Sequence, residues 1–256
     1  MATGVHIYLI GAAWVIGVAL LAGLTAHLTR RFTEKEGRAE NNESAGQVFT
    51  IVGGLHAVLI AFVLIGLFDA VGAAKDTSYQ EANSLVATVW ASDELPAPTG
   101  ARVRELAASY AHQVINTEWP QMAAANTVNG AGWNTLIEMK NTIGETTTTT
   151  MWLDSRKAEA STQLLSVYQN RQQRLNDAGA GISAVIWFAL LVGSVLSLGL
   201  PLLFGGPKVR AHIVIVSTMA ATLAVLLFAI YQLQNPFAGG ASIGPDAFQS
   251  ALGRLR

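Results

Sequence analysis

Cysteine is absent from this chain of 256 residues, and charged residues make up only 13% of it. The absence of cysteine excludes disulfides, thiol nucleophiles and cysteine-ligated zinc or iron–sulfur sites. Soluble domains usually carry about 25% charged residues, so the low share points to contact with lipid. The 16 basic and 17 acidic residues give a net charge of −1. The chain therefore lacks the positive field that would indicate a nucleic-acid partner.

Enzyme signatures are also absent from the sequence. There is no Gly-x-Ser-x-Gly elbow, no Walker-type loop, no His-Glu-x-x-His and no dinucleotide fingerprint. The five histidines are scattered along the chain, and none is paired with another at the spacing of metal ligands. We therefore predict that the chain is not an enzyme, and that it has no metal site and no cofactor.

Long apolar runs dominate what the sequence does contain. Four of them are long enough, at about 20 residues each, to cross the ~30 Å hydrocarbon core of a bilayer as helices. They cover residues 6–28, 48–71, 182–204 and 212–233. The chain is thus predicted to be an all-α integral membrane protein with four transmembrane helices in the lipid bilayer.

The region between the second and third spans keeps the spacing of amphipathic helices. Helical periodicity continues past span two through residues 75–90, and no proline or glycine interrupts it before Pro96. We expect one helix of about 45 residues there, which at ~67 Å is twice the hydrocarbon thickness. A further helix over 101–116 is expected to end at the Glu118-Trp119-Pro120 unit, and another is expected over 151–176.

These patterns divide the chain into four parts. Residues 1–75 form the first transmembrane pair, 76–181 a helical extramembrane domain inserted between spans two and three, 182–233 the second pair, and 234–256 a tail. Short cytoplasmic loops are enriched in basic residues. Loop one carries Arg30, Arg31, Lys35 and Arg38, and the turn over 205–210 carries two more. In the cell membrane, domain 76–181 and both termini are therefore expected to be extracytoplasmic.

Span two carries the candidate functional residues. His56 lies within the span, where a titratable group is costly and is a functional candidate by default. On a helix, one face of span two holds an apolar row that could form a constriction if several chains make a ring. The candidates for lining or gating are Phe49, Gly53, His56, Ile60, Leu64, Phe68 and Asp69.

Three structural alternatives stay open for the same span. His56 can simply bond a neighbouring helix, and Asp69 can simply sit at the membrane interface. The small residues Gly53, Gly54, Ala57 and Ala61 can equally be contacts between packed helices.

The extramembrane domain contains charged residues on its predicted helices. We expect structural ion pairing, with Glu118 as the acceptor for an arginine, and a ligand or ion site is the alternative. The candidates for these pairs are Glu81, Arg102, Glu118, Arg171 and Arg174.

Several short motifs together resemble a known family. They are Glu81-Ala82, Tyr110 followed by Glu118-Trp119-Pro120, Arg171 with Arg174-Leu175, Trp187, and Asn235-Pro236-Phe237. They resemble the bestrophin-like family of bacterial four-helix membrane proteins over nearly the whole chain. The resemblance implies kinship with bestrophins, which are pentameric anion channels with four spans in each subunit.

We therefore expect a homo-oligomeric ion channel or pore that passes small ions and is lined by the second transmembrane helix. A homo-oligomer is expected because four helices in one chain leave little room for a water-filled path. The alternative is a non-transporting membrane scaffold or sensor whose helical domain binds a partner.

Overall fold

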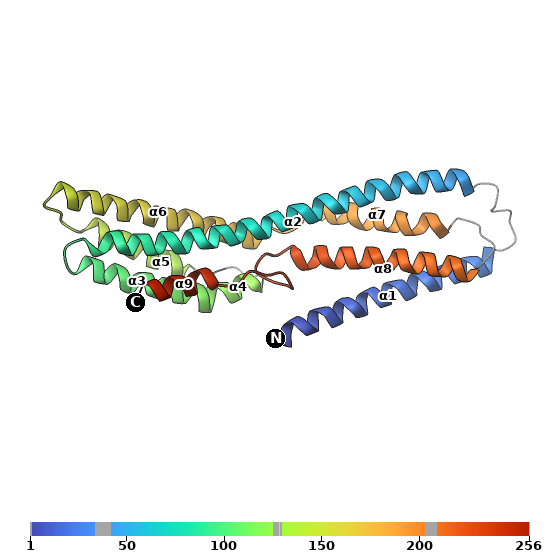
Figure 1. The fold of residues 1–256 in the computed structure, drawn as a ribbon, viewed down its shortest axis with the longest axis horizontal. Helices are drawn as coiled ribbons and strands as arrows, with labels where there is room; N and C mark the ends of the chain where they lie inside the picture. Colours follow the sequence, from blue (N-terminus) through green and yellow to red (C-terminus); the bar gives the residue numbers. More distant parts are fainter. Residues whose placement is uncertain (1, 34–41, 125–127, 129, 203–208, 256) are drawn as a thin grey trace. The chain divides into compact units, whose positions relative to one another are not determined.

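The computed structural model describes residues 2–33, 42–124, 128, 130–202 and 209–255, and within these ranges it contains helices and no strand (Figure 1). The helices are α1 (Ala2–Thr33), α2 (Asn42–Asp93), α3 (Thr99–Gln113), the π-helix η1 (Val114–Glu118), α4 (Trp119–Ala123), α5 (Ala131–Gly144), α6 (Met151–Gly179), α7 (Ala184–Leu202), α8 (Val209–Leu233) and α9 (Asp246–Arg254). Among the described residues, four helical stretches are long and apolar enough to cross a membrane. The predicted all-α membrane fold is confirmed.

The chain forms two compact units. Unit 1 consists of Met1–Phe68 and Ile182–Gln234, and unit 2 consists of Asp69–Gly181 and Asn235–Arg256. The predicted long helix is confirmed, because α2 runs without a break for 52 residues and contributes to both units. The tail groups with unit 2.

Small residues allow close packing in unit 1. Helices α1 and α8 lie against each other, and Ala26, Ala220 and Ala224 are buried between helices. At Gly23 of α1, an added Cβ would lie 2.5 Å from Ser217 Oγ of α8, so no larger residue fits without a shift. Close backbone approach of this kind is the usual basis of helix association in membranes.

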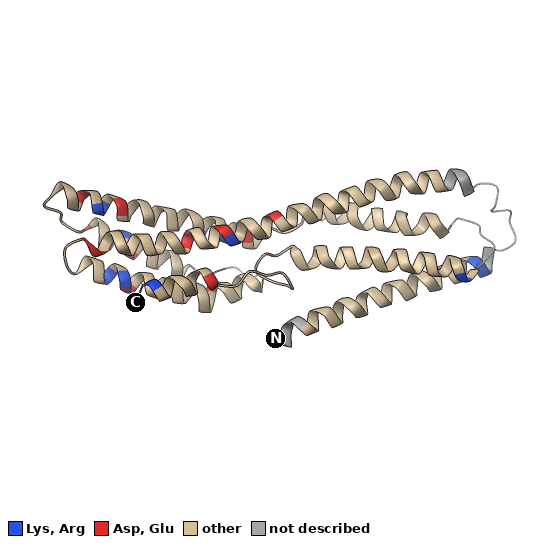
Figure 2. Cartoon of the chain, in the orientation of Figure 1, with Lys and Arg blue, Asp and Glu red and all other residues tan. Residues whose placement is uncertain are grey.

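Basic residues gather at one end of unit 1 (Figure 2). Arg30 and Arg31 lie in the last turn of α1, and Arg210 lies in the first turn of α8. The prediction of orientation also counted the charges of Lys35, Arg38 and Lys208. These three residues fall outside the described residues.

Unit 2 is a helical bundle with a single apolar core. Leu85 of α2, Val103 of α3 and Met139 of α5 are among its fully buried side chains. The tail closes this core, since Phe237 and Phe248 are also buried there. Their rings meet Trp119 edge to face, at centroid distances of 5.2 and 6.1 Å.

The predicted helix end at Pro120 is wrong. The chain stays helical from Thr99 to Ala123, because η1 joins α3 to α4 through a wide turn in which the Trp119 N–H donates to the Val114 carbonyl. Proline in a regular α-helix lacks a donor and clashes with the carbonyl four residues earlier. A π-turn widens the helix at this point, so Pro120 is accommodated in place of ending it.

Candidate functional site

Five side chains form a closed hydrogen-bonded ring in the interior of unit 2. They are Glu81 of α2, Tyr110 of α3, Glu118 of η1, and Arg171 and Arg174 of α6, and all five are fully buried. We call this set the ion-pair ring. It joins four helical segments that lie far apart in the sequence.

Each member of the ring bonds to two others. Arg174 donates from Nε to Glu81 Oε2 at 2.7 Å and from Nη2 to Glu118 Oε2 at 3.0 Å. Arg171 Nη1 donates to Glu118 Oε2 at 2.6 Å and to the Tyr110 hydroxyl at 3.3 Å. The Tyr110 hydroxyl donates to Glu81 Oε1 and closes the ring.

Local helix geometry explains why these residues meet. Arg171 and Arg174 are three residues apart on α6, so both side chains leave the same face of the helix. Glu118 is the last residue of the π-turn, which places its carboxylate between the two guanidinium groups. The wide turn that accommodates Pro120 is therefore also the element that carries the shared acceptor.

The charges inside the ring balance, with two carboxylates against two guanidinium groups. Burial opposes the charge on Arg174, but Glu81 and Glu118 more than compensate and raise its pKa above the ordinary value. Burial also opposes the charge on Arg171, whose pKa is nevertheless raised by Tyr110 and Glu118. The pKa of Tyr110 is well above its ordinary value, because the phenol is buried and lies beside Glu81.

One side of the ring has unused polar atoms. Glu118 Oε1 and the Nε and Nη2 atoms of Arg171 have no hydrogen-bond partner among the described residues. The Arg171 guanidinium lies 4.5 Å from the ring centre of Trp133, a cation–π distance. A Cβ added to Gly132 would lie 2.6 Å from Arg171 Nη2 and closer still to Glu118 Oε1, so this position has no room for a side chain.

Arg102, the fifth predicted ion-pair candidate, lies apart from the ring. It pairs with Glu105 at 2.6 Å and with Glu138, and all three side chains are exposed. Such surface pairs contribute little to stability. The structure thus brings together four of the five candidates and adds Tyr110, which the sequence analysis named only among the motifs of the family resemblance.

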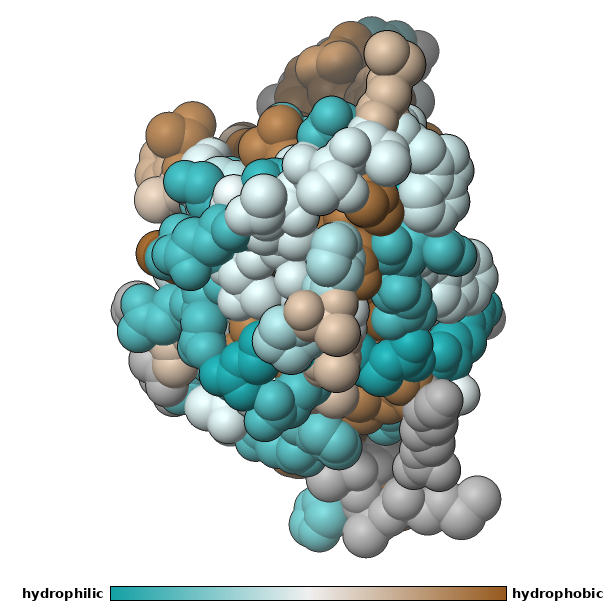
Figure 3. All heavy atoms as spheres, turned by 90° about the vertical axis from the view of Figure 1, so that its left-hand side faces the viewer, coloured by the Kyte–Doolittle hydropathy of each residue, from teal (hydrophilic) through white to brown (hydrophobic). Residues whose placement is uncertain are grey.

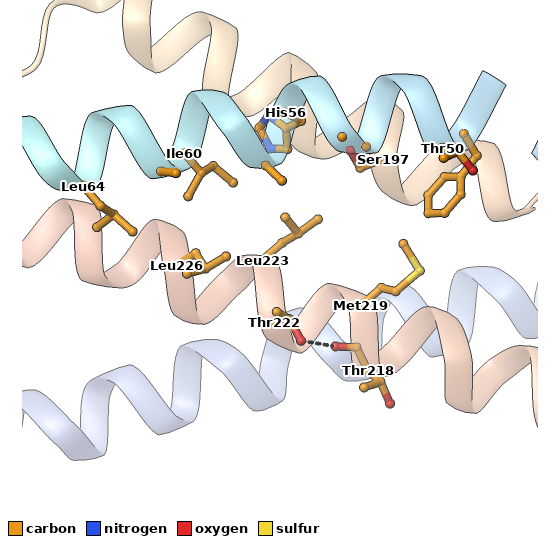
Figure 4. A pocket seen from close by; sticks show the side chains of 15 residues that line it. Thr50, His56, Ile60, Leu64, Ser197, Thr218, Met219, Thr222, Leu223 and Leu226 are labelled. Atoms are coloured by element: carbon orange, nitrogen blue, oxygen red, sulfur yellow. Dashed lines mark hydrogen bonds between the residues drawn. The ribbon is translucent and has the colours of Figure 1, made fainter. Parts of the chain in front are cut away.

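A cavity of about 630 Å³ lies in unit 1 between α2, α7 and α8 (Figure 4). Among the residues predicted to line or gate a pore, five line this cavity: Phe49, Gly53, His56, Ile60 and Leu64. Phe68 and Asp69 are exposed and are not part of its lining. A row on α8 from Thr218 to Leu226 forms the opposite wall, and Ser197 of α7 completes the lining on the α2 side.

His56 is held by α7. Its Nε2 lies 3.1 Å from Ser194 Oγ, and Ser194 already donates its only hydroxyl proton to the Leu190 carbonyl at 2.8 Å. The neutral imidazole must therefore carry its proton on Nε2 and donate it to Ser194. Nδ1 has no hydrogen-bond partner among the described residues and faces Gly193, where an added Cβ would lie 2.7 Å from the ring's Cε1.

The small residues of α2 leave the space that forms part of the cavity. Gly53, Gly54, Ala57 and Ala61 all line it. No described atom lies within 4 Å of a Cβ built on Gly54, and Gly53 meets only the side chain of Phe49 on its own helix. Within one chain, the two glycines are therefore not the helix-packing contacts that their size could have indicated.

The described residues contain no group of three or more His, Cys, Asp or Glu side chains placed to hold a metal ion.

Comparison with known proteins places the chain in a family. The model of the bestrophin-like domain matches residues 16–248. A crystal structure of a bacterial bestrophin homologue from Klebsiella pneumoniae, obtained by Zn-SAD phasing, has a TM-score of 0.70 at 14% identity and covers 95% of this chain and 97% of that one. A single-substitution variant of a Klebsiella pneumoniae homologue has a TM-score of 0.71 at 14% identity, over 94% of this chain and 97% of that one. No curated protein sequence matches the chain. The two structures share its fold, and the domain match shows that the chain belongs to the bestrophin-like family.

Proposed function

We propose that the chain is one subunit of a homo-oligomeric ion channel whose pore is lined by α2. Its membership of the bestrophin-like family supports a channel. The cavity inside a single chain has a mostly apolar lining, which does not suit a hydrated ion path. The path is therefore assigned to an axis between subunits.

The two faces of α2 differ in a way that supports this arrangement. His56 and Ile60 are only 5% and 3% exposed, because their face is turned into the chain. The opposite face carries a row spaced by three and four residues, which we call the outer stripe: Ile51, Leu55, Val58, Phe62, Ile65 and Asp69. We assign the pore lining to the outer stripe, and we give His56 a structural role on the closed face.

The exposed outer stripe is the observation that carries the proposal. Its apolar members are 53% to 70% exposed in the single chain. Copies of such a row around an axis would form stacked apolar rings, which can gate a pore by dewetting. A ring of Asp69 carboxylates after them would favour cations at that end of the pore.

Ion flux through proteoliposomes and planar bilayers tests the proposal. We expect the purified full chain to conduct, Phe62→Ala to raise the conductance by widening an apolar ring, and Asp69→Asn to lower the preference for cations. Leu20→Ala, at an equally exposed position on α1, is the control and should change neither. Absence of flux at every pH from about 5 to 8, the range in which histidine titrates, would contradict a channel.

We infer the orientation of the chain in the membrane from the basic residues at one end of unit 1. The basic residues Arg30, Arg31 and Arg210 suit a cytoplasmic membrane face, which puts residues 76–181 and both termini outside the cytoplasm. Because the chain has no cysteine, a single Thr149→Cys variant can report this. A membrane-impermeant maleimide should label this cysteine on intact cells. Labelling only after lysis would contradict the proposed orientation and place residues 76–181 in the cytoplasm.

A second candidate function rests on exposed apolar side chains of unit 2. Trp90, Met151 and Trp152 are 60%, 88% and 55% exposed. Figure 3 shows a mostly hydrophilic end surface with scattered apolar patches among the polar atoms. These side chains favour a scaffold or sensor that binds a protein partner. Absence of flux together with reproducible capture of one partner by the full chain would select this function.

A further inference from the structure

The face of α2 that carries Asp69 stays exposed along the part of α2 that belongs to unit 2. Asp69, Asp76 and Asn83 follow one another at steps of seven residues, which is close to two helical turns, so they share one face. Gln80 lies on that face between the last two. All four residues are exposed. We call these four residues the polar stripe.

The polar stripe is exposed because the opposite face of α2 contributes to the core of unit 2. Ala74, Glu81, Leu85 and Val89 lie on that opposite face and are buried. Helix α2 is unbroken over its 52 residues, and the polar stripe begins at Asp69, where the outer stripe ends. In the proposed channel, the apolar rings of the outer stripe are therefore followed along the same helix by carboxylate and amide groups.

A cation from the end of the chain lies on the polar stripe. Arg254, the last residue of α9, donates a hydrogen bond from Nη1 to Asn83 Oδ1 at 3.2 Å, although 171 residues separate the two in sequence. Arg254 is exposed. None of the ion pairs between described residues includes Arg254, Asp69 or Asp76. Their charges are therefore not neutralised within the part of the chain that the structure describes.

The packing of α9 fixes the position of this cation. Phe248 and Leu255, which come before and directly after Arg254 in the sequence, are buried in the core of unit 2. Arg104 of α3 donates to the Leu255 carbonyl at 3.3 Å. The end of α9 is thus attached to α3 through Arg104 and to α2 through Asn83, so the fold as well as the hydrogen bond holds the guanidinium in place.

Arg254 acts on the same ions as the carboxylates of the polar stripe. Asp76 is seven residues from Asn83, about 10 Å along α2 at ~1.5 Å per residue. This length is close to the Debye length of ~8 Å at physiological ionic strength. A cation on this path is attracted by Asp76 and repelled by Arg254 about one Debye length further on. Rings of charged side chains determine which ions enter a pore, so the two groups have opposing effects on the preference for cations.

We propose that Arg254 limits the preference of the channel for cations, and that Asn83 is the positioning residue that holds its guanidinium on the polar stripe. This role depends on the proposed channel lined by α2, and it adds a residue of the tail to the groups that determine ion selectivity. One copy of Arg254 from each subunit gives a positive ring, opposite in sign to the rings of Asp69 and Asp76.

The reversal potential of the full chain in planar bilayers tests this role. In a gradient of potassium chloride, it gives the permeability ratio of potassium to chloride. We expect Arg254→Gln to raise that ratio about twofold or more, because a unit charge about 10 Å away in water changes the local concentration of a univalent ion roughly twofold. Asp76→Asn removes the opposite charge and should lower the ratio. Arg254→Lys keeps the charge and should leave the ratio near that of the wild type.

Three further measurements separate an effect of charge from an effect on structure. Asn83→Ala releases the guanidinium and should change the ratio in the same direction as Arg254→Gln, by a smaller factor. Lys140→Gln removes an exposed cation from α5 and, as the control, should leave the ratio unchanged. Higher salt should shrink the effect of Arg254→Gln, because the Debye length falls from ~30 Å at 0.01 M to ~3 Å at 1 M.

The outcomes distinguish a failure of this role from a failure of the proposed channel. Conduction with equal ratios in the wild type and Arg254→Gln would overturn the role of Arg254 without contradicting the channel. An equal change in Lys140→Gln, or a change that is as large at 1 M salt as at low salt, would also overturn the role of Arg254 alone. Absence of conduction in the wild type would overturn both the channel and this role.

Discussion

Arg174 binds Glu81 through two hydrogen bonds in the interior of unit 2, although 93 residues separate them in sequence. Nε meets Oε2 at 2.7 Å, Nη2 meets Oε1 at 3.1 Å, and both side chains are fully buried. The pair links α6 to α2. A geometry of this kind means that neither charge tolerates loss of the other.

Removal of one charge from the ring should therefore destabilise unit 2 strongly. We expect Glu81→Gln to lower the free energy of unfolding by about 3–5 kcal/mol, since it leaves two buried guanidinium groups, those of Arg171 and Arg174, with the single carboxylate of Glu118 between them. Equilibrium unfolding of the purified chain in detergent measures this. As the control, Asp93→Asn removes the partner of Arg104 in a partly exposed pair and should cost at most ~1 kcal/mol. Equal effects of the two variants would contradict a special role for the buried ring.

Alkaline pH should weaken unit 2 through Tyr110. Its folded-state pKa is raised by burial and by Glu81, so the folded chain keeps the phenol proton that the unfolded chain loses near pH ~10. The stabilisation is complete below that pH and is lost as pH rises toward the folded-state pKa, at about 1.4 kcal/mol per pH unit.

Comparison with Tyr110→Phe isolates this contribution. The variant lacks the titrating proton, so the stability difference between wild type and variant should shrink above about pH 10 and stay constant below it. Unfolding measured across that range gives the difference directly. A difference that does not change with pH would show that Tyr110 titrates normally.

Gly132→Ala should disturb the ring by steric overlap. The new methyl group would lie 2.6 Å from Arg171 Nη2, and crowding of this kind typically costs about 1–3 kcal/mol. Gly144→Ala lies on the same helix with open space around its Cβ and should be neutral or stabilising. Thermal unfolding measures the melting temperatures of the two variants, and we expect that of Gly132→Ala to be the lower. Similar melting temperatures would show that the ring is easily displaced.

Gly193→Ala should displace His56 from Ser194. The added methyl group would overlap the imidazole, whose Cε1 lies 2.7 Å away, so we expect a loss of about 1–3 kcal/mol and a shifted imidazole signal in the NMR spectrum. Gly199→Ala, on the same helix with no described atom within 4 Å, is the control. An unchanged imidazole signal in Gly193→Ala would contradict the contact.

The membrane fold was predictable because length and hydropathy dictate it. A run of about 20 apolar residues has few structures available other than a spanning helix. The spacing of Arg171 and Arg174 indicated a shared face, and Glu118 was the natural acceptor. Sequence could not indicate Tyr110 as a ring member, because a tyrosine on an apolar stripe packs equally well without using its hydroxyl.

Two features of the structure could not be predicted from the sequence, for physical reasons. Proline usually ends a helix, and only the three-dimensional packing of Trp119 and Glu118 shows why a π-turn is retained before Pro120. Gly53 and Gly54 on a spanning helix fit close packing and an open cavity equally well. The positions of α7 and α8 decide between the two, and these depend on the whole of unit 1.

The burial of Phe237 and Phe248 has a consequence for biosynthesis. The ribosome makes residues 69–181 first, then α7 and α8, and only then the segment that covers Trp119. Two membrane crossings return that segment to the side of its binding partners. Until residues 235–248 have been made, the core around Trp119 lacks the rings of Phe237 and Phe248, so a chain that stops just after α8 would expose apolar surface on the bundle.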